Sequence, residues 1–500
     1  MKSFRNLLLV FFCFFLLVSG KNFAQTFQQE LGNVAQANNL VGMSVIAMCN
    51  GQMIDSYHYG LSDIDRNIKT SDQTYYRIAS ISKTVTATAL MVLYDEGWFQ
   101  LNDNINSYLD FDISNPNYPN SEITFTMLLS HTSGLSDGSG YQQFLSDTYN
   151  QATPPHISEL LQQSGGYFTS NMWLNTKPGN YFNYSNINYG VIATLIEQIS
   201  GVRFDEFVKN RILEPLGISG SFNIDDIGDI GQVAVLYRNA VAQADNYQGV
   251  APDPFDADSY TVGTNGVVFA PQGGLRITTP DLLKFMALHA NNGTYEQVQV
   301  LSAPAAQLMH SPVWTYDGTN GNNYYNLFNS WGLGLHLTTG RPMGDIVFND
   351  VPMIGHPGEA YGLISDMYFE KEKQFGLIFL TNGYYAGGYE YGDQSAFYSI
   401  EEQVFDVIGD FFWNSCKPVG NILLQRTPVV SFYYNRHSHS LHFNNAPGGQ
   451  LIIVNSIGET VLQQNVSQQC FSLPKRLSGG VYVVKYLCSS GEEYAESFVF

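Results

Sequence analysis

The stretch Ser80-Ile81-Ser82-Lys83 places a serine and a lysine three residues apart at a predicted helix start. Residues at positions i and i+3 lie on one helix face, so the Ser80 hydroxyl and the Lys83 amine can meet. A serine becomes a good nucleophile only when a base takes its proton, and a lysine is such a base only when burial or a nearby cation keeps it neutral. Mostly apolar residues follow at 84–93, so we expect the pair at the inner end of a buried helix. The alternative is a chance match that exposes the lysine.

The composition is that of a large globular protein. Five hundred residues allow two or three domains, and an apolar content of 44% allows a sizeable core. The net charge of −21 argues against nucleic acid or an anionic membrane surface as a partner. We expect no metal or other cofactor, because no carboxylate or cysteine completes a ligand set beside His437, His439 and His442.

The N-terminus has the layout of a secretory signal peptide, predicted over residues 1–24. Lys2 and Arg5 precede an apolar run at 7–18, and small and polar residues follow up to Ala24. The run is short for a membrane span, and no other stretch reaches about 20 apolar residues. We therefore expect an exported protein, secreted or on the cell surface, with no transmembrane span in the mature chain.

Four cysteines follow that segment: Cys49, Cys416, Cys470 and Cys488. An exported protein can oxidise them. Cys470 and Cys488 lie in one short β-rich segment and are the predicted pair, although connectivity cannot be read from sequence.

Hydrophobic patterning predicts an α+β domain followed by a smaller all-β domain. Residues 41–60 alternate and contain Asn50-Gly51, a strong hairpin signal. Helices are expected at 78–97, 189–199 and 282–290, and strands at 333–339, 363–369 and 376–382. The predicted domains are residues 28–412, a linker at 413–428 and a small β-sandwich at 429–500.

Two further segments carry groups that fit a serine nucleophile. Tyr184-Ser185-Asn186 supplies a phenol that can act as a base or a proton shuttle, and an amide that can position the lysine or a substrate carbonyl. Gly355-His356-Pro357-Gly358 precedes a predicted strand, and the small Gly358 allows a substrate backbone to approach closely.

With these segments the chain resembles the serine β-lactamase and penicillin-binding-protein superfamily, in particular the class C β-lactamase-like serine hydrolases. The resemblance covers roughly residues 28–410 and implies a β-lactamase/transpeptidase-like fold, an antiparallel sheet flanked by helices plus a mainly helical subdomain. The matching text is Arg77-Ile78-Ala79-Ser80-Ile81-Ser82-Lys83, His131-Thr132-Ser133-Gly134-Leu135, Pro178-Gly179, Phe182-Asn183-Tyr184-Ser185-Asn186, Gly273-Gly274-Leu275-Arg276 and Gly355-His356-Pro357-Gly358.

The resemblance also implies roles for single residues. Ser80 would be the acylated nucleophile, while Lys83 and Tyr184 would share the role of base. Asn186 would orient the substrate and Lys83. The backbone N–H groups of Ser80 and Glu359 would form the oxyanion hole.

His356 departs from the family pattern. It stands where these enzymes usually carry a lysine that recognises the substrate carboxylate, and a neutral imidazole holds a carboxylate less firmly. This favours an esterase, an amidase or a D-amino-acid peptidase, acting on a small molecule or a peptide such as a cell-wall peptide. The alternatives are a β-lactamase or a penicillin-binding sensor that acylates with little turnover, and a catalytically dead surface-binding protein.

Other patterns receive a structural interpretation. Gly134 to Gly138 matches G-x-S-x-G, but the strand and helix that a nucleophile elbow needs are not expected around Ser136. His131 is interpreted as a structural hydrogen-bonding residue near the cleft. The tyrosines of one late segment either line a substrate cleft or cover a loop: Tyr384, Tyr385, Tyr389 and Tyr391.

The last seventy residues carry a second resemblance, to the C-terminal sorting domain of the type IX secretion system of Bacteroidetes. The matching residues are Val454 to Glu459, Leu473, Leu477 and Gly479 to Val484. The resemblance implies the type IX secretion machinery as a partner and agrees with the export that the signal peptide predicts.

Overall fold

The computed structural model describes residues 26–418 and the strands between residues 431 and 499. The chain divides into two compact units, residues 1–418 and 419–500. The predicted signal peptide and residues 419–428 of the predicted linker lie outside the described residues. No helix within the described residues is long and apolar enough to span a membrane.

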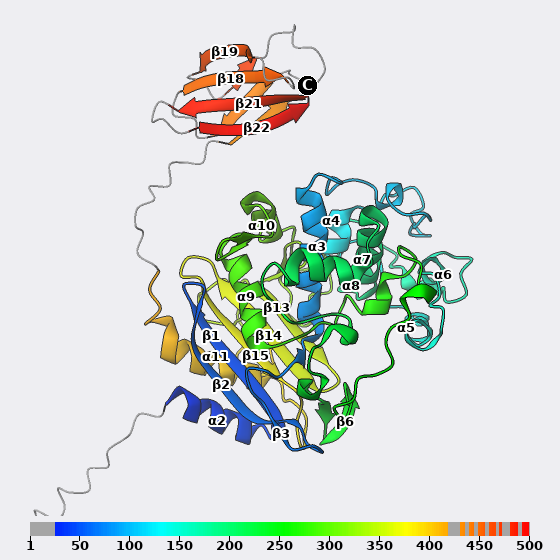
Figure 1. The fold of residues 1–500 in the computed structure, drawn as a ribbon, viewed down its shortest axis with the longest axis vertical. Helices are drawn as coiled ribbons and strands as arrows, with labels where there is room; N and C mark the ends of the chain where they lie inside the picture. Colours follow the sequence, from blue (N-terminus) through cyan, green and yellow to red (C-terminus); the bar gives the residue numbers. More distant parts are fainter. Residues whose placement is uncertain are drawn as a thin grey trace, which may run out of the picture. The chain divides into compact units, whose positions relative to one another are not determined.

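The first unit is built on an antiparallel sheet that joins segments from its two ends, because β15 pairs with β1 (Figure 1). In spatial order its strands are β10 (Trp314–Thr315), β11 (Ser330–Trp331), β12 (His336–Leu337), β13 (Ile354–Ala360), β14 (Leu363–Glu370), β15 (Phe375–Thr381), β1 (Gly42–Cys49), β2 (Gln52–Asp63) and β3 (Ile68–Lys69). The predicted hairpin joins β1 to β2, and Asn50 and Gly51 have the positive φ values that its tight turn requires. The predicted fold class is confirmed.

Helices cover both faces of this sheet (Figure 1). The α-helices described in the first unit are α2 (Phe27–Ala37), α3 (Ser82–Asp95), α4 (Phe125–Leu129), α5 (Tyr141–Asn150), α6 (Ser158–Leu161), α7 (Ile187–Ser200), α8 (Phe204–Val208), α9 (Thr279–Ala290), α10 (Ala303–Met309) and α11 (Ser399–Ile408). Of these, α2, α9 and α11 pack directly on strands of the sheet. Along β1, Met43 and Val45 join the core formed with α2 and α11, whereas Ile46 and Met48 join the core formed with α9 and the helical subdomain. Successive side chains of one strand thus serve two layers.

Helix α3 is buried on all sides. Every residue from Ser82 to Leu93 is buried, and α7 packs directly against it. A helix that is apolar around most of its circumference belongs in a protein interior. The predicted helix from residue 189 also forms, as α7, and ends at Gly201 with φ 69°. Lys83 therefore starts a helix that lies in the core.

Three short strand pairs complete the first unit: β4 (Tyr76–Arg77) with β7 (Arg276–Ile277), β5 (Leu236–Arg238) with β6 (Val241–Ala244), and β8 (Thr294–Tyr295) with β9 (Val298–Gln299). The first pair brings the segment before Ser80 beside the predicted Gly273-Gly274-Leu275-Arg276 segment.

The second unit is all β in its described residues. It has two antiparallel sheets, β16-β17-β20 and β19-β18-β21-β22. The strands are β16 (Ser431–Asn435), β17 (Ser440–Asn444), β18 (Gly449–Asn455), β19 (Thr460–Val466), β20 (Cys470–Ser472), β21 (Val481–Cys488) and β22 (Glu493–Val499). His437, His439 and the side chains of His442, Cys470 and Cys488 lie outside what the structure describes.

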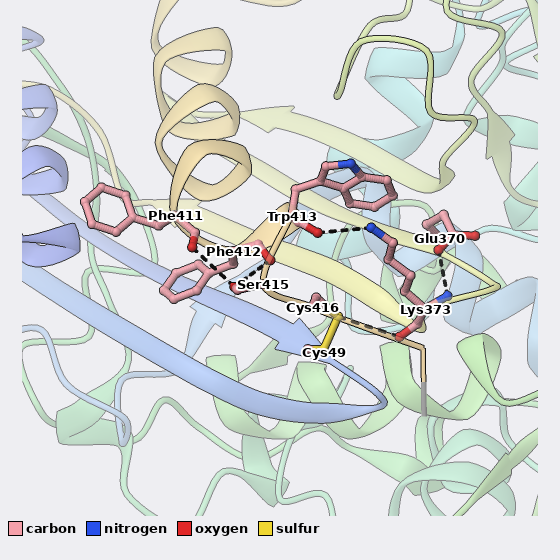
Figure 2. Close-up of a disulfide and its surroundings, with 8 residues drawn as sticks. All are labelled: Cys49, Glu370, Lys373, Phe411, Phe412, Trp413, Ser415 and Cys416. Carbon is pink, nitrogen blue, oxygen red and sulfur yellow. Dashed lines mark hydrogen bonds between the residues drawn. A yellow bond between two sulfur atoms is a disulfide. The ribbon is translucent and has the colours of Figure 1, made fainter. Parts of the chain in front are cut away.

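A disulfide joins Cys49, at the end of β1, to Cys416 near the end of the first unit (Figure 2). The two cysteines are 367 positions apart in sequence. Beside them, Lys373 Nζ donates to the Trp413 carbonyl at 3.0 Å. These contacts hold residues 413–416, the start of the predicted linker, in the first unit.

The disulfide should contribute about 2–4 kcal/mol to the free energy of unfolding of the first unit, because it closes a long loop of the unfolded chain. A Cys49→Ser/Cys416→Ser variant should lose this amount in denaturant unfolding followed by tryptophan fluorescence. Reductant should lower the unfolding midpoint of the wild type to that of the variant and leave the variant unchanged. Equal midpoints for the oxidised wild type and the variant would contradict the expectation.

Candidate active site

Ser80 and Lys83 meet as predicted. Lys83 Nζ lies 3.0 Å from Ser80 Oγ. Ser80 is not part of the α-helix, however, because it lies in the tight 3₁₀ turn Ala79–Ile81 that precedes α3. Ala79 has φ 45°, a left-handed conformation that costs an alanine free energy. The Ser365 hydroxyl fastens this turn to β14 by donating to the Ile78 carbonyl at 2.9 Å.

The Lys83 amine is enclosed. Its side chain is fully buried, Nζ donates to the Gln272 carbonyl at 2.7 Å, and the ring centroid of Tyr184 lies 4.9 Å from Nζ. Burial disfavours the ammonium and lowers the pKa of Lys83 to about 7, while the charge of Asp137 acts weakly in the opposite direction. A substantial fraction of the amine is thus neutral near pH 7 and can accept a proton.

The Tyr184 side chain lies beside Ser80 in the wall of one cavity, close enough for the Ser80 hydroxyl to act on its pKa. Burial raises the pKa of Tyr184 well above 10, so the phenol stays protonated at neutral pH. Its ring stacks on Phe328 with centroids 5.3 Å apart and lies 4.5 Å from the ring of His131. Packing therefore fixes a proton donor beside the nucleophile.

Two buried histidines support this arrangement. His131 Nδ1 accepts the backbone N–H of Ser185 at 3.1 Å, which fits the structural role predicted for it. His356 is fully buried, and its Nδ1 donates to the Pro357 carbonyl at 2.6 Å. Burial holds the pKa of both imidazoles well below 6.5, so both are neutral. His356 packs against Tyr184 and Trp331, with centroids 6.0 and 5.2 Å apart.

Asp137 is a site residue that the sequence interpretation missed. Its carboxylate accepts the Ser185 hydroxyl at 3.1 Å, the Asn186 amide nitrogen at 2.8 Å, and the backbone N–H groups of Asn186 and Ile187 at 3.0 Å each. It therefore caps α7 and fixes Asn186. Its only signal was its position beside Ser136, which lies in a loop rather than at a strand-to-helix elbow. Because the cap bridges 49 positions, no local pattern reveals it.

Strand β13 passes close to the nucleophile. It pairs with β12 only at Ile354 and Gly355, and beyond them the turn that carries Ser80 lies against it. A Cβ at Gly358 would overlap Ser365 Oγ and lie 3.0 Å from the backbone nitrogen of Ser80. Only glycine allows this approach, which brings Glu359 to the site.

Two cavities meet at Ser80 and Glu359. The first, here called the aromatic cavity, has a volume of about 870 Å³ and includes Tyr184. The second, the polar cavity, has a volume of about 1120 Å³ and includes Asn186. Pro357 and Gly358 line the aromatic cavity, but His356 lines neither, so the predicted contact of its imidazole with substrate has no support in this geometry. The sequence left undecided whether four late tyrosines line a cleft or cover a loop. Tyr391 lines the aromatic cavity, whereas Tyr384, Tyr385 and Tyr389 do not.

Within the described residues no group of three His, Cys, Asp or Glu side chains is placed to hold a metal ion. Ser80, Lys83 and Tyr184 lie together at the meeting point of the cavities. Together they supply a nucleophile, a neutral amine and a protonated phenol in mutual contact, which is what acyl transfer through a serine requires.

Solved structures share this fold. The octameric penicillin-binding protein homologue from Pyrococcus abyssi superposes with a TM-score of 0.54 at 18% identity, over 95% of each chain. D-amino acid amidase from Ochrobactrum anthropi SV3 superposes with a TM-score of 0.55 at 21% identity, over 78% of this chain and 98% of its own. These likenesses show the fold alone.

Sequence comparison identifies the family. Penicillin-binding protein 4* of Bacillus subtilis is 25% identical over 361 residues, which are 72% of this chain and 71% of that protein. Protein flp of Staphylococcus aureus is 29% identical over 193 residues, only 37% of its length. The profile of the Beta-lactamase family matches residues 23–396, more than half of the chain, and the chain therefore belongs to the Beta-lactamase family.

Proposed function

We propose that this protein is an exported serine hydrolase of the class C-like group that acts on an ester, an amide or a peptide through an acyl-enzyme on Ser80. The observation that carries the proposal is the buried Lys83 amine, 3.0 Å from Ser80 Oγ, with its pKa lowered to about 7. A lysine in a structural role would be charged and solvated, whereas a buried neutral one is suited to general-base catalysis.

In acylation, Lys83 takes the Ser80 proton as Oγ forms a bond to the substrate carbonyl carbon. The developing oxyanion accepts hydrogen bonds from the backbone N–H groups of Ser80 and Glu359. Tyr184 passes its proton to the leaving oxygen or nitrogen, whose bond to carbon then breaks, and the proton that Lys83 took from Ser80 restores the phenol. Water attacks the acyl-enzyme in the same geometry, and the carboxylic acid product leaves Ser80 free. Asn186, held by Asp137, orients the substrate carbonyl.

The substrate range proposed is that of an esterase or a D-amino-acid peptidase, including cell-wall peptides. The similar D-amino acid amidase and the β-lactamase/D-alanine carboxypeptidase of Yersinia pestis are named for such activities. The buried, neutral His356 supports this range, because it provides no charged anchor for a β-lactam carboxylate. The name of penicillin-binding protein 4* favours a second candidate, a protein that acylates with penicillin and turns over little.

Export is proposed from the signal peptide pattern at residues 1–24 and the resemblance of residues 429–500 to a type IX sorting domain. The Cys49–Cys416 disulfide supports it, because such bonds persist mainly in oxidising compartments. The type IX secretion machinery would be the partner of the second unit.

Incubation with a fluorophosphonate, and separately with a penicillin, should add one adduct to the wild type in intact-mass measurements and none to Ser80→Ala. No adduct on the wild type would refute the acyl-enzyme, and an adduct that survives in Ser80→Ala would place the nucleophile elsewhere. Among a set of esters, D-Ala-D-Ala peptides and a chromogenic cephalosporin, we expect the ester or peptide to be turned over fastest. A cephalosporin preference would contradict the role given to His356.

The value of kcat/KM should rise with pH through a midpoint near 7, because only neutral Lys83 accepts the Ser80 proton. Lys83→Arg, which stays protonated at every accessible pH, should lose at least about a hundredfold of the rate. A flat profile between pH 5.5 and 8.5 would exclude Lys83 as the base.

Asp137→Asn provides the matched variant for this profile. The Asp137 charge raises the pKa of Lys83, so its removal should move the midpoint of the kcat/KM profile toward lower pH. The same substitution weakens the cap of α7 and should cost about 1 kcal/mol of stability. A loss of stability without any shift of the midpoint would mean that Asp137 acts on α7 alone.

Deletion of residues 429–500 should leave the protein in the periplasm of a Bacteroidetes host that has type IX secretion, while the full chain reaches the surface or the medium. Fractionation and immunoblotting give the measurement, and serine labelling of the retained protein shows that it has folded. Unchanged secretion of the truncated chain would contradict the sorting role.

A further inference from the structure

The aromatic cavity has an unusual composition for a site beside a nucleophile. Seven of the residues that line it are Tyr or Phe, including Tyr324, Tyr391 and Tyr398. Two glutamates, Glu359 and Glu401, also line it, and among its described lining residues none is Lys, Arg or His. Aromatic faces and carboxylates both attract cations.

The geometry of this cavity presents those groups to a ligand. Tyr391 is 80% exposed and Tyr324 36%, so their ring faces are accessible. Tyr391 stacks on Tyr398 with centroids 5.4 Å apart. The Tyr398 hydroxyl donates to Glu359 Oε2 at 2.9 Å, which fixes an exposed carboxylate within the aromatic surface.

A second carboxyl group in the cavity wall is buried beside another carboxyl group, with few groups nearby that would stabilise a negative charge. Glu401 is 4% exposed, and beside it Asp366 is fully buried and receives no hydrogen bond from a donor in the described residues other than the Glu401 carboxyl. Burial raises the pKa of Glu401 to about 8, and that of Asp366 is also raised. Among the described residues that line the cavity there is no cation to let this pair ionise, and a ligand cation would do so.

The position of Tyr184 indicates which part of the substrate, the acyl group or the leaving group, would occupy the aromatic cavity. Tyr184 contacts Ser80 and lines the aromatic cavity but not the polar one. The group that protonates the leaving atom must lie beside that atom in the transition state. The leaving group therefore occupies the aromatic cavity, and the acyl group extends into the polar cavity.

We propose that the aromatic cavity selects leaving groups that carry a positively charged ammonium, held by the rings of Tyr324 and Tyr391 and by the Glu359 and Glu401 carboxyls. The inference rests on the proposed function and narrows its substrate range, because Glu359 and Glu401 would repel the carboxylate of a leaving D-alanine and so disfavour D-Ala-D-Ala peptides. In the reaction, Ser80 Oγ bonds to the acyl carbon and the bond from that carbon to the ammonium-bearing alcohol or amine breaks. The Ser80 proton reaches the leaving atom through Lys83 and Tyr184.

The test compares two alcohols of nearly the same shape, choline and 3,3-dimethyl-1-butanol, which differ by one positive charge. Each is titrated as a protectant against fluorophosphonate labelling of Ser80, and their butyrate esters are compared as substrates. We expect choline to protect at about tenfold lower concentration, and its ester to show a similarly larger kcat/KM, because a desolvated ammonium on aromatic faces is worth about a factor of ten or more.

Glu359→Gln keeps the backbone N–H and removes the charge, so it should reduce the ratio of choline protection to neutral-alcohol protection severalfold. Glu401→Gln should act in the same direction, with its melting temperature measured because Glu401 also accepts the Tyr398 backbone N–H at the start of α11. The matched control is Asp393→Asn, which removes an exposed charge from the segment between β15 and α11 that also carries Tyr391 and Tyr398; Asp393 lines neither cavity. It should leave the preference unchanged.

The possible outcomes distinguish the ammonium site from the proposed serine hydrolase function. Equal protection by choline and the neutral alcohol, with Ser80 still labelled, would overturn the ammonium site and leave the hydrolase intact. Equal effects of Glu359→Gln and Asp393→Asn would assign the preference to the net charge of −21 and would also overturn it. Failure of Ser80 to label at all would remove the proposed function and this inference with it.

Discussion

The burial of one amine against one hydroxyl is the constraint on which the rest of the structure depends. A lowering of the Lys83 pKa from 10.5 to about 7 corresponds to roughly 5 kcal/mol of lost stability near neutral pH. Because the folded pKa lies below the unfolded one, this penalty is present in full below pH 7 and fades as pH rises toward 10.5. The wide core around α3 and α7 offsets it.

The groups around Ser80 come from segments far apart in the chain, and each is held by its own contact. Ser365 fastens the nucleophile turn to β14, Asp137 fixes Asn186 at the start of α7, and Gly358 lets β13 approach the Ser80 backbone. None of these contacts involves Lys83 directly, yet together they close the space around it. Preorganisation of this kind keeps a buried, neutral amine near a hydroxyl that faces the two cavities.

The features that the sequence predicted are those decided by neighbouring residues. Asn50-Gly51 determines a turn by its own backbone preferences, Gly201 ends α7 in the same way, and the contact between Ser80 and Lys83 follows from a spacing of three. Features that depend on distant segments were missed. The Cys49–Cys416 disulfide and the Asp137 cap fall in this group, because pairings over 367 and 49 positions leave no local trace.

His356 shows a different limit. Its place in the motif was found from sequence, but its burial and its neutral state follow from packing against Tyr184 and Trp331 and from a hydrogen bond to its neighbour's carbonyl. With no charge there, the electrostatic asymmetry of the site comes from its two sides. On the polar side the lining charges are of both signs, because Arg77, Arg238 and Arg276 lie in the same wall as Asp225, Asp253 and Glu359. On the aromatic side the charged groups among the described lining residues are the carboxylates Glu359 and Glu401. The carboxylates beside Tyr184 favour a substrate whose positive end leaves, whereas among the described lining residues arginines are found only on the side that would take the acyl group.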